Sequence, residues 1–439
     1  PFLFDGVRPR RRGGRPPPAP TPALRPGARG ALPLDGLRVV DLGTWWVGGY
    51  AGSALGALGA DVVKVESTRR IDGSRTLGGF GLDRDRWWET GSIYLGSNSN
   101  KRAITLDLAQ PAGRELLVRL IAEADVLIEN YSPRVMESIG LDWTAVREVN
   151  ARLVMQRMPA FGLTGPRRDM VGYAQTVEQY AGLCWRTGYL DGEPLNPNGL
   201  ADPMGAANSL LALLAALLVA RRTGRGSLVE SPLAEAAAVM AAEQVVTWTA
   251  EGRPLGRRGN RDDAAHLQGV FPARGTDRWL AVTVADEAQW SVLVKVAGLD
   301  TWAGDAGLGT REARQAQADR LEAELGQWTA ERDAEETVEL LLAAGIPAGV
   351  VRDPRFLHEH PHLSRREHFV VAELPELGPV PLPQLPVRPA GGGWLARRRP
   401  PTLGEHNAEV LGGELGLRPE ELAALEGTHV IGTVPAGAP

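Results

Sequence analysis

Residues 37–66, LRVVDLGTWWVGGYAGSALGALGADVVKVE, decide the fold of this chain. The segment predicts a buried strand over 37–42, an Ala/Gly/Leu-rich helix over 50–58 and a second strand over 61–66. Two neighbouring strands joined by a helix run parallel, because a parallel connection needs about a dozen residues or more. We therefore expect one βαβ unit in which small residues let the helix pack closely on the sheet.

The same alternation continues through the next hundred residues. Helices are predicted over 111–122, 133–139 and 143–149, and strands over 124–129 and 153–157. Strands separated by helices are typical of a mostly parallel, doubly wound α/β sheet. Two apolar helices (173–186 and 203–222), a strand (227–230) and another helix (234–250) are expected to follow.

A second region has a different order of elements. Strands over 269–273 and 279–284 are followed by helices over 287–297, 311–328 and 334–344, which predicts a smaller α+β domain. Residues 375–401 are proline-rich and are expected to be irregular, with helices over 407–415 and 419–425 closing the chain.

Residues 1–32 differ in composition from the rest of the chain. They carry seven arginines against one acidic residue, Asp5, so the remaining residues hold 41 basic and 52 acidic side chains. That acidic balance disfavours a general nucleic-acid-binding surface. The Pro/Gly/Arg-rich tail is expected to be disordered or a linker to an upstream module, and the sharper alternative is a basic anchor for RNA or acidic lipid.

Composition bounds the class of protein. The chain has 439 residues, 43% of them hydrophobic, which is enough for two or three domains with large cores. The longest apolar run, 210–220, is shorter than the roughly 20 residues of a membrane-spanning helix. Cys184 is the only cysteine, so no internal disulfide is expected and we predict a cytoplasmic protein that does not bind membranes.

Several familiar kinds of catalytic site are not supported. The glycines after the first strand do not form GxGxxG, and no GxSxG nucleophile elbow is present. The histidines clustered in 358–368 lie in a proline-broken stretch without a cysteine partner, so no metal site is predicted. Cys184 lies in an apolar helix and is interpreted as a structural thiol.

Cations and carboxylates are the remaining candidates. The chain has three lysines, of which Lys64 and Lys101 (beside Arg102) are either phosphate ligands or ordinary surface charges. Glu178 lies in a weakly polar helix and Asp202 precedes Pro203 at a helix start. Each carboxylate is either a structural group or a reactive one.

From about residue 32 to residue 432 the chain resembles the class III coenzyme A transferases, the family of formyl-CoA transferase, CaiB and BaiF. The resemblance rests on motifs that agree in order: 34–42 (LDGLRVVDL), 58–66 (LGADVVKVE), 100–108 (NKRAITLDL), 124–130 (ADVLIEN), 221–226 (RRTGRG), 345–349 (GIPAG) and 403–406 (LGEH). It implies a Rossmann-like large domain built from both chain ends, a small domain, and two subunits that interlock as rings.

The resemblance, taken with the element order, divides the chain into five parts. These are a tail (1–32), the first part of a large CoA-binding domain (33–225), a linker helix and hinge (226–265), a small domain (266–365) and a segment that returns to the large domain (366–439).

Such enzymes transfer CoA from an acyl-CoA donor to a carboxylic acid, without a metal or a tightly bound cofactor. The resemblance implies an aspartate nucleophile that follows a Gly-Tyr pair, but here Ala174 follows Tyr173. Glu178 lies about one helical turn later on the same face and is our candidate for a displaced nucleophile.

The alternative is that the chain is one half of a heteromeric or fused enzyme whose other half carries the aspartate. In that case the chain by itself is a CoA-binding subunit without turnover. The resemblance implies a homodimer or a heterodimer with a related CoA-transferase subunit. By position, the resemblance implies CoA contacts from Val47, Gly48, Lys64, Lys101, Arg102 and Arg134.

Overall fold

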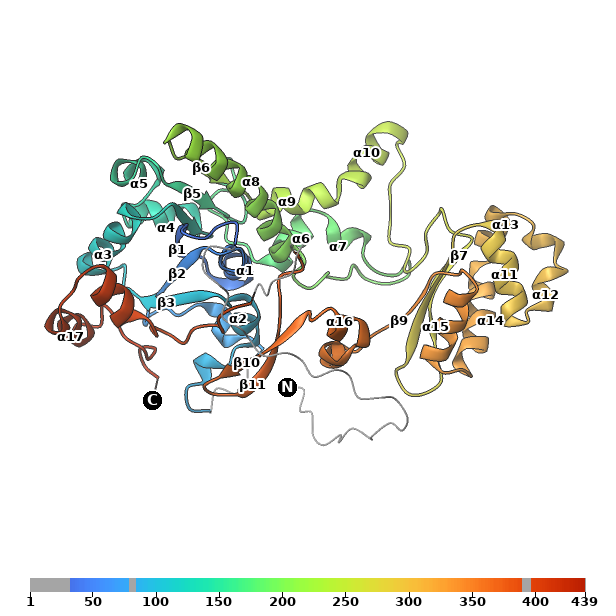
Figure 1. Ribbon diagram of the computed structural model, residues 1–439. Coiled ribbons are helices and arrows are strands. Elements are labelled where there is room, and N and C mark those ends of the chain that lie inside the picture. The colour runs from blue at the N-terminus through green and yellow to red at the C-terminus, as the bar shows by residue number, and fades with distance from the viewer. Residues whose placement is uncertain (1–31, 79–83, 389–395, 439) are drawn as a thin grey trace. The chain divides into compact units, whose positions relative to one another are not determined.

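The computed structural model describes residues 32–78, 84–388 and 396–438 (Figure 1). The tail expected over 1–32 therefore lies almost wholly outside the described residues. The chain forms two compact units. The first unit draws on residues 1–158, 209–230 and 355–439, and the second on 159–208 and 231–354.

The first unit is built on a six-stranded, fully parallel sheet with the order β3-β2-β1-β4-β5-β6. Its strands are β1 (Arg38–Asp41), β2 (Asp61–Glu66), β3 (Lys101–Thr105), β4 (Val126–Glu129), β5 (Val154–Arg157) and β6 (Leu228–Glu230). Strands β1 to β5 are almost entirely buried, as expected when helices cover both faces of a parallel sheet. The predicted doubly wound α/β architecture is confirmed.

Helices connect these strands. They are α1 (Trp45–Ala57), α2 (Ser92–Ser97), α3 (Pro111–Ala122), α4 (Pro133–Ser138) and α5 (Trp143–Val149), with two single 3-10 turns at Gly73–Thr76 and Trp87–Glu89. Helix α1 begins five residues earlier than the sequence predicts, so only three residues separate it from β1. This short connection brings the start of α1 directly onto the carboxyl end of the sheet.

Both chain ends contribute to this unit. Val410, Leu411, Val430 and Ile431 are buried in the same core as Val40 and Leu127 of the sheet. The carboxyl-terminal part contains α16 (Pro361–Arg365), a π-helix (Ala408–Glu414) and α17 (Pro419–Gly427). The prediction of a large domain built from both ends of the chain is confirmed.

The expectation of irregular structure over 375–401 is wrong for its first part. Strand β11 (Gly378–Pro383) pairs antiparallel with β10 (Phe369–Leu374) in a two-stranded sheet. Three prolines alternate along β11. Such prolines are compatible with an edge strand, because the nitrogens that lack hydrogens can face away from the partner strand.

The second unit is α+β, as predicted. Its antiparallel sheet has the order β7-β8-β9 and is formed by Leu267–Pro272, Trp279–Val284 and Ala348–Val350. Residues of β7 and β8 share a core with α11 (Glu287–Ala297), α14 (Ala318–Ala330) and α15 (Ala334–Ala343). The shorter helices α12 (Asp300–Ala303) and α13 (Arg311–Ala316) complete this part.

The remainder of the second unit is helical. It contains α6 (Ala174–Tyr180), α7 (Leu183–Arg186), α9 (Leu233–Met240) and α10 (Ala242–Glu251). The single helix expected over 173–186 is broken between α6 and α7 at Gly182, which has a φ of +84° that a helix interior does not allow. The long helix α8 (Ala201–Thr223) begins in the second unit and ends in the first.

Candidate active site

The connection between β1 and α1 is held by buried side chains through its backbone. The amide of Gly43 donates to Asp41 Oδ1 (2.8 Å), and its carbonyl accepts from Lys64 Nζ (2.7 Å). The amide of Thr44 donates to Asn130 Oδ1 (2.7 Å), while Asn130 Nδ2 donates to the carbonyl of Thr44 (3.0 Å). We call residues 42–46, which comprise the three connecting residues and the first two residues of α1, the β1–α1 loop. These hydrogen bonds fix the main chain of Gly43 and Thr44.

This loop lies where the strand order of the sheet reverses. Strand β1 pairs with β2 on one side and with β4 on the other, and Asn130 directly follows β4. In an open parallel sheet, ligands bind outside the carboxyl ends of the strands at this reversal point. The Thr44–Asn130 hydrogen bonds join the two strand ends on either side of it.

Lys64, predicted as a phosphate ligand, lies inside the first unit with 0% of its surface exposed. Its ammonium pairs with Asp72 Oδ2 at 2.8 Å. Burial lowers the pKa of Lys64, but Asp72, Glu66 and Asp41 outweigh that effect and raise it above its ordinary value. Lys64 therefore remains charged beneath the loop.

Lys101 is also buried, with 1% exposed. Its ammonium contacts Asp41 Oδ2 (2.7 Å) and Asn98 Oδ1 (2.8 Å). Burial dominates and lowers the pKa of Lys101 to about 8, although Asp41 raises it. The pair lies directly under Gly52 of α1, where an added Cβ would stand 2.2 Å from Asp41 Oδ2.

Val47 and Gly48 lie in the first turn of α1 and are buried. A Cβ on Gly48 would stand 2.6 Å from the Cα of Gly43 and 2.9 Å from Asn130 Oδ1. Gly48 thus lets the helix contact its own entry loop. Both residues are adjacent to the β1–α1 loop, and their contact with CoA stays a prediction.

The two predicted arginines lie at opposite ends of the sheet. Arg134 is exposed in the first turn of α4, just after β4. Arg102 follows Lys101 at the start of β3 and pairs with Asp61 (2.6 Å), Glu409 (2.9 Å) and Glu414. Asp61 is the first residue of β2. The side chain of Arg102 therefore lies at the amino ends of the strands, away from the reversal point.

One cation at the carboxyl edge was not singled out from the sequence. Arg70 follows β2 and is exposed at the same edge as Arg134. The sequence feature that identifies Arg70 as a candidate is its position four residues after the end of a buried strand.

Glu178, the predicted nucleophile, lies in α6 with 0% exposed. Its carboxylate accepts from the amide of Ala201 (3.0 Å), the first residue of α8, and from the amide of Gly199 (3.4 Å), two residues before the helix. Burial raises the pKa of the neighbouring Cys184 thiol, and the negative charge of Glu178 raises it further. Glu178 therefore satisfies amide hydrogens at the start of α8 that the helix itself cannot pair.

Asp202 is the neighbouring carboxylate. It lies in the first turn of α8, is 8% exposed, and directly follows Ala201, which Glu178 holds. The amino end of a helix stabilises negative charge, here at the start of a 23-residue helix. Asp202 is recognisable in the sequence as an acidic residue before Pro203 at a helix start, although Glu178 is the carboxylate that the sequence pattern favours.

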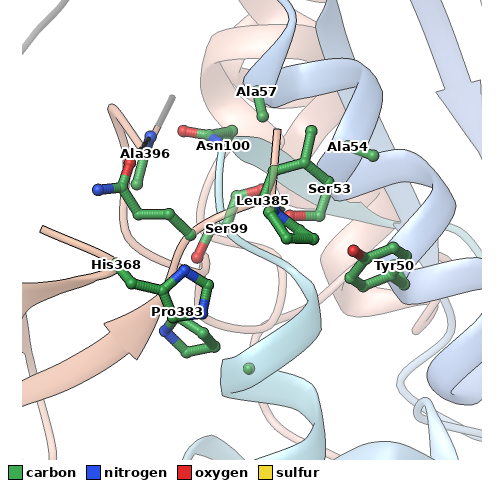
Figure 2. A pocket seen from close by; sticks show the side chains of 13 residues that line it. Tyr50, Ser53, Ala54, Ala57, Ser99, Asn100, His368, Pro383, Leu385 and Ala396 are labelled. Carbon is green, nitrogen blue, oxygen red and sulfur yellow. Dashed lines mark hydrogen bonds between the residues drawn. The ribbon is translucent and has the colours of Figure 1, made fainter. Parts of the chain in front are cut away.

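A cavity of about 240 Å³ lies elsewhere in the first unit (Figure 2). Figure 2 shows Tyr50, Ser53 and Ala54 of α1 on one side and His368 and Pro383 on the other. Its lining contains neither the β1–α1 loop nor the two carboxylates of the second unit.

Within the part of the chain that the structure describes, no cluster of three or more His, Cys, Asp or Glu side chains could hold a metal ion. In that same part, helix α8 is long and apolar enough to cross a bilayer by length and composition alone, a test that core helices of soluble proteins also pass.

Comparison with known proteins gives consistent matches. Residues 34–407 match the sequence model of CoA-transferase family III. Succinyl-CoA–D-citramalate CoA-transferase of Chloroflexus aurantiacus is 29% identical over 405 residues, covering 91% of this chain and 98% of that protein. The beta subunit of succinyl-CoA–L-malate CoA-transferase of the same organism is 30% identical, covering 92% and 100%.

A solved structure has the same fold. The crystal structure of a CAIB/BAIF family protein from Brucella suis matches with a TM-score of 0.79 and 29% identity, covering 87% of this chain and 99% of that one.

Proposed function

Because this chain belongs to CoA-transferase family III, we propose that it moves CoA from an acyl-CoA thioester to a carboxylic acid, with Asp202 as the attacking carboxylate. Two features support the proposal besides the family match. The first unit presents a fixed loop at the reversal point of a parallel sheet, and the second unit presents a carboxylate in the first turn of a long helix.

The reaction needs only carboxylates and the thioester. A carboxylate oxygen attacks the thioester carbonyl and the CoA thiolate leaves, which gives a mixed anhydride on the enzyme. The thiolate then attacks the enzyme's carbonyl, so the donor acid departs and an enzyme–CoA thioester forms. The acceptor carboxylate repeats both exchanges in reverse, which restores the side chain and yields the new acyl-CoA.

The choice between the two carboxylates follows from the hydrogen bonds of Glu178 and from the position of Asp202 in the first turn of α8. Both oxygens of Glu178 accept from the backbone at the start of α8, so an attack by Glu178 would first break the contacts with Gly199 and Ala201. We therefore assign Glu178 the task of fixing the helix start, and Asp202 the attack. The role of Glu178 as nucleophile stays a prediction, as does the supply of an aspartate by a partner half in place of Ala174.

The nucleotide end of CoA is assigned to the carboxyl edge of the sheet. Arg134 and Arg70 provide exposed cations there for phosphates. Val47 and Gly48 begin α1, whose first amides favour anions. Lys64 and Lys101 add positive charge from beneath the loop, whereas a contact from Arg102 is supported by the family pattern alone.

We propose succinyl-CoA as the first donor to test, because both Chloroflexus relatives carry succinyl-CoA in their names. The acceptor is a carboxylic acid of a class that the described residues do not define. The single cysteine is compatible with a cytoplasmic enzyme.

A second family III subunit, identical or related, is the proposed partner. Helix α10 has no buried residue, and Val246 and Trp248 on it are 62% and 57% exposed. Exposed apolar side chains of this size indicate a protein interface. The beta-subunit name of one relative supports a heteromer, a homodimer is the alternative, and interlocking of the two chains is part of this proposal.

The test measures transfer of CoA from succinyl-CoA to a panel of dicarboxylates by the unaltered chain, Asp202→Asn and Glu178→Gln. We expect Asp202→Asn to lose activity at least about a thousandfold, because it removes the nucleophile. If Asp202→Asn kept its activity while Glu178→Gln lost it, the nucleophile would be Glu178. A chain that binds CoA but transfers nothing would point to the binding-only subunit.

A further inference from the structure

Trp45, the first residue of α1, has an unusual backbone conformation. Its φ is +56°, in the left-handed region that bulky residues rarely occupy. Its indole lies against Gly73, because a Cβ built on Gly73 would stand 2.2 Å from the ring. A residue in this conformation persists only where its surroundings hold it there.

Asp72 supplies that hold. Its Oδ1 accepts from the amide of Trp45 (2.8 Å), from the amide of Ser74 (2.9 Å) and from the hydroxyl of Ser74 (2.8 Å). Its Oδ2 accepts from Lys64, which also donates to the carbonyl of Gly43. One carboxylate and one ammonium thus hold the loop on both sides of Thr44.

Asp72 is itself fixed. It is 1% exposed, and its own amide donates to Glu66 Oε2 (3.1 Å) at the end of β2. Because the carboxylate is buried with every oxygen occupied, it cannot contact a ligand without breaking these bonds. Any effect of Asp72 on binding must pass through the groups that it holds, above all the amide of Trp45 and the ammonium of Lys64.

We propose that Asp72 is a positioning residue for CoA binding: it keeps Trp45 left-handed, and so fixes the direction in which the β1–α1 loop and the first amides of α1 face the ligand. This inference rests on the proposed function, since it takes CoA as the ligand of the loop. Asp72 thereby influences CoA binding without touching CoA, through its hydrogen bond with the main-chain amide of Trp45.

The experiment is a double-mutant cycle on the full chain, with CoA itself titrated calorimetrically. Asp72→Asn keeps the shape of the side chain and removes the charge that pairs with Lys64. Trp45→Gly allows the left-handed conformation without a side-chain penalty. We expect Asp72→Asn to weaken CoA binding about tenfold alone and less than about threefold in the Trp45→Gly background.

A steady-state readout accompanies the titration. The KM for the acyl-CoA donor should rise about tenfold with Asp72→Asn, while kcat falls less than about threefold, because the carboxylate that reacts is untouched. The matched control is Glu89→Gln, which removes a buried carboxylate paired with Arg75 at 2.7 Å. It should lower the melting temperature and leave CoA affinity within about twofold.

Equal weakening by Asp72→Asn in both backgrounds would overturn the inference, since it would show a general structural effect. Unchanged affinity in a folded Asp72→Asn protein would overturn it as well. If that variant does not fold, Ser74→Ala replaces it in the cycle, with an expected loss of about two- to threefold, and no loss would overturn the inference. If the unaltered chain bound no CoA, the proposed function would fail first.

Discussion

Replacing Gly52 by alanine tests whether the buried pair under α1 determines how that helix lies. A Cβ at position 52 would stand 2.2 Å from Asp41 Oδ2 and 2.8 Å from Lys101 Nζ. Neither side chain can move aside into solvent, since both have 0% of their surface exposed. Either α1 moves away from the sheet or the ion pair separates.

The expected cost follows from three terms. Alanine is a better helix former than glycine by about 1 kcal/mol, which favours the variant. Forcing an extra methyl into a packed interior costs about 1–3 kcal/mol, and disrupting a buried ion pair costs about 3–5 kcal/mol. With separation of the pair, the three terms together give a net loss of about 3–7 kcal/mol in the free energy of unfolding.

The assay is urea unfolding of the intact chain, followed by circular dichroism. The matched control is Gly96→Ala in α2, where an added Cβ meets no atom within 4 Å, so this variant should gain up to about 1 kcal/mol. A loss below about 1 kcal/mol for Gly52→Ala, or an equal loss for Gly96→Ala, would show that the added methyl group does not separate the buried ion pair.

Three further predictions concern the same features. Glu178→Gln should lower the free energy of unfolding by about 1–3 kcal/mol, measured by urea titration, because the amides at the start of α8 lose a charged acceptor. The folded protein binds the Lys101 proton more weakly than the unfolded chain does. Stability should therefore rise with pH from about 8 toward 10.5, by about 2 kcal/mol between pH 7.5 and 9.5 relative to Lys101→Met. An equal slope in both proteins would contradict the lowered pKa. Val246→Asp on α10 should prevent assembly during folding, so that the variant refolded from urea sediments as a monomer, and an unchanged sedimentation coefficient would exclude α10 from the interface.

Much of the fold could be predicted because local pattern and tertiary structure agree. Strand β2 and helices α3 and α5 lie at the residues that the hydrophobic pattern predicts. The start of α1 was missed because a tryptophan with a φ of +56° contradicts local preference. That conformation depends on Asp72, which is 27 residues away in the sequence.

The site was less predictable, because charge patterns do not reveal burial. Lys64 and Lys101 were candidates for direct phosphate contact, yet each pairs with an aspartate inside the first unit. Glu178 was selected by its distance from Ala174 along one helix, whereas its partners are the amides before and at the start of another helix. Such partners follow from tertiary structure alone.

Trapping the acylated enzyme tests most directly whether Asp202 is the nucleophile. The full chain is incubated with succinyl-CoA and hydroxylamine, which converts an activated carboxyl into a stable hydroxamate, and its peptides are then analysed by mass spectrometry. We predict a hydroxamate on Asp202 and none on Glu178, with loss of the product in Asp202→Asn. Transfer of CoA with an unmodified Asp202, or a hydroxamate on Glu178, would contradict the account.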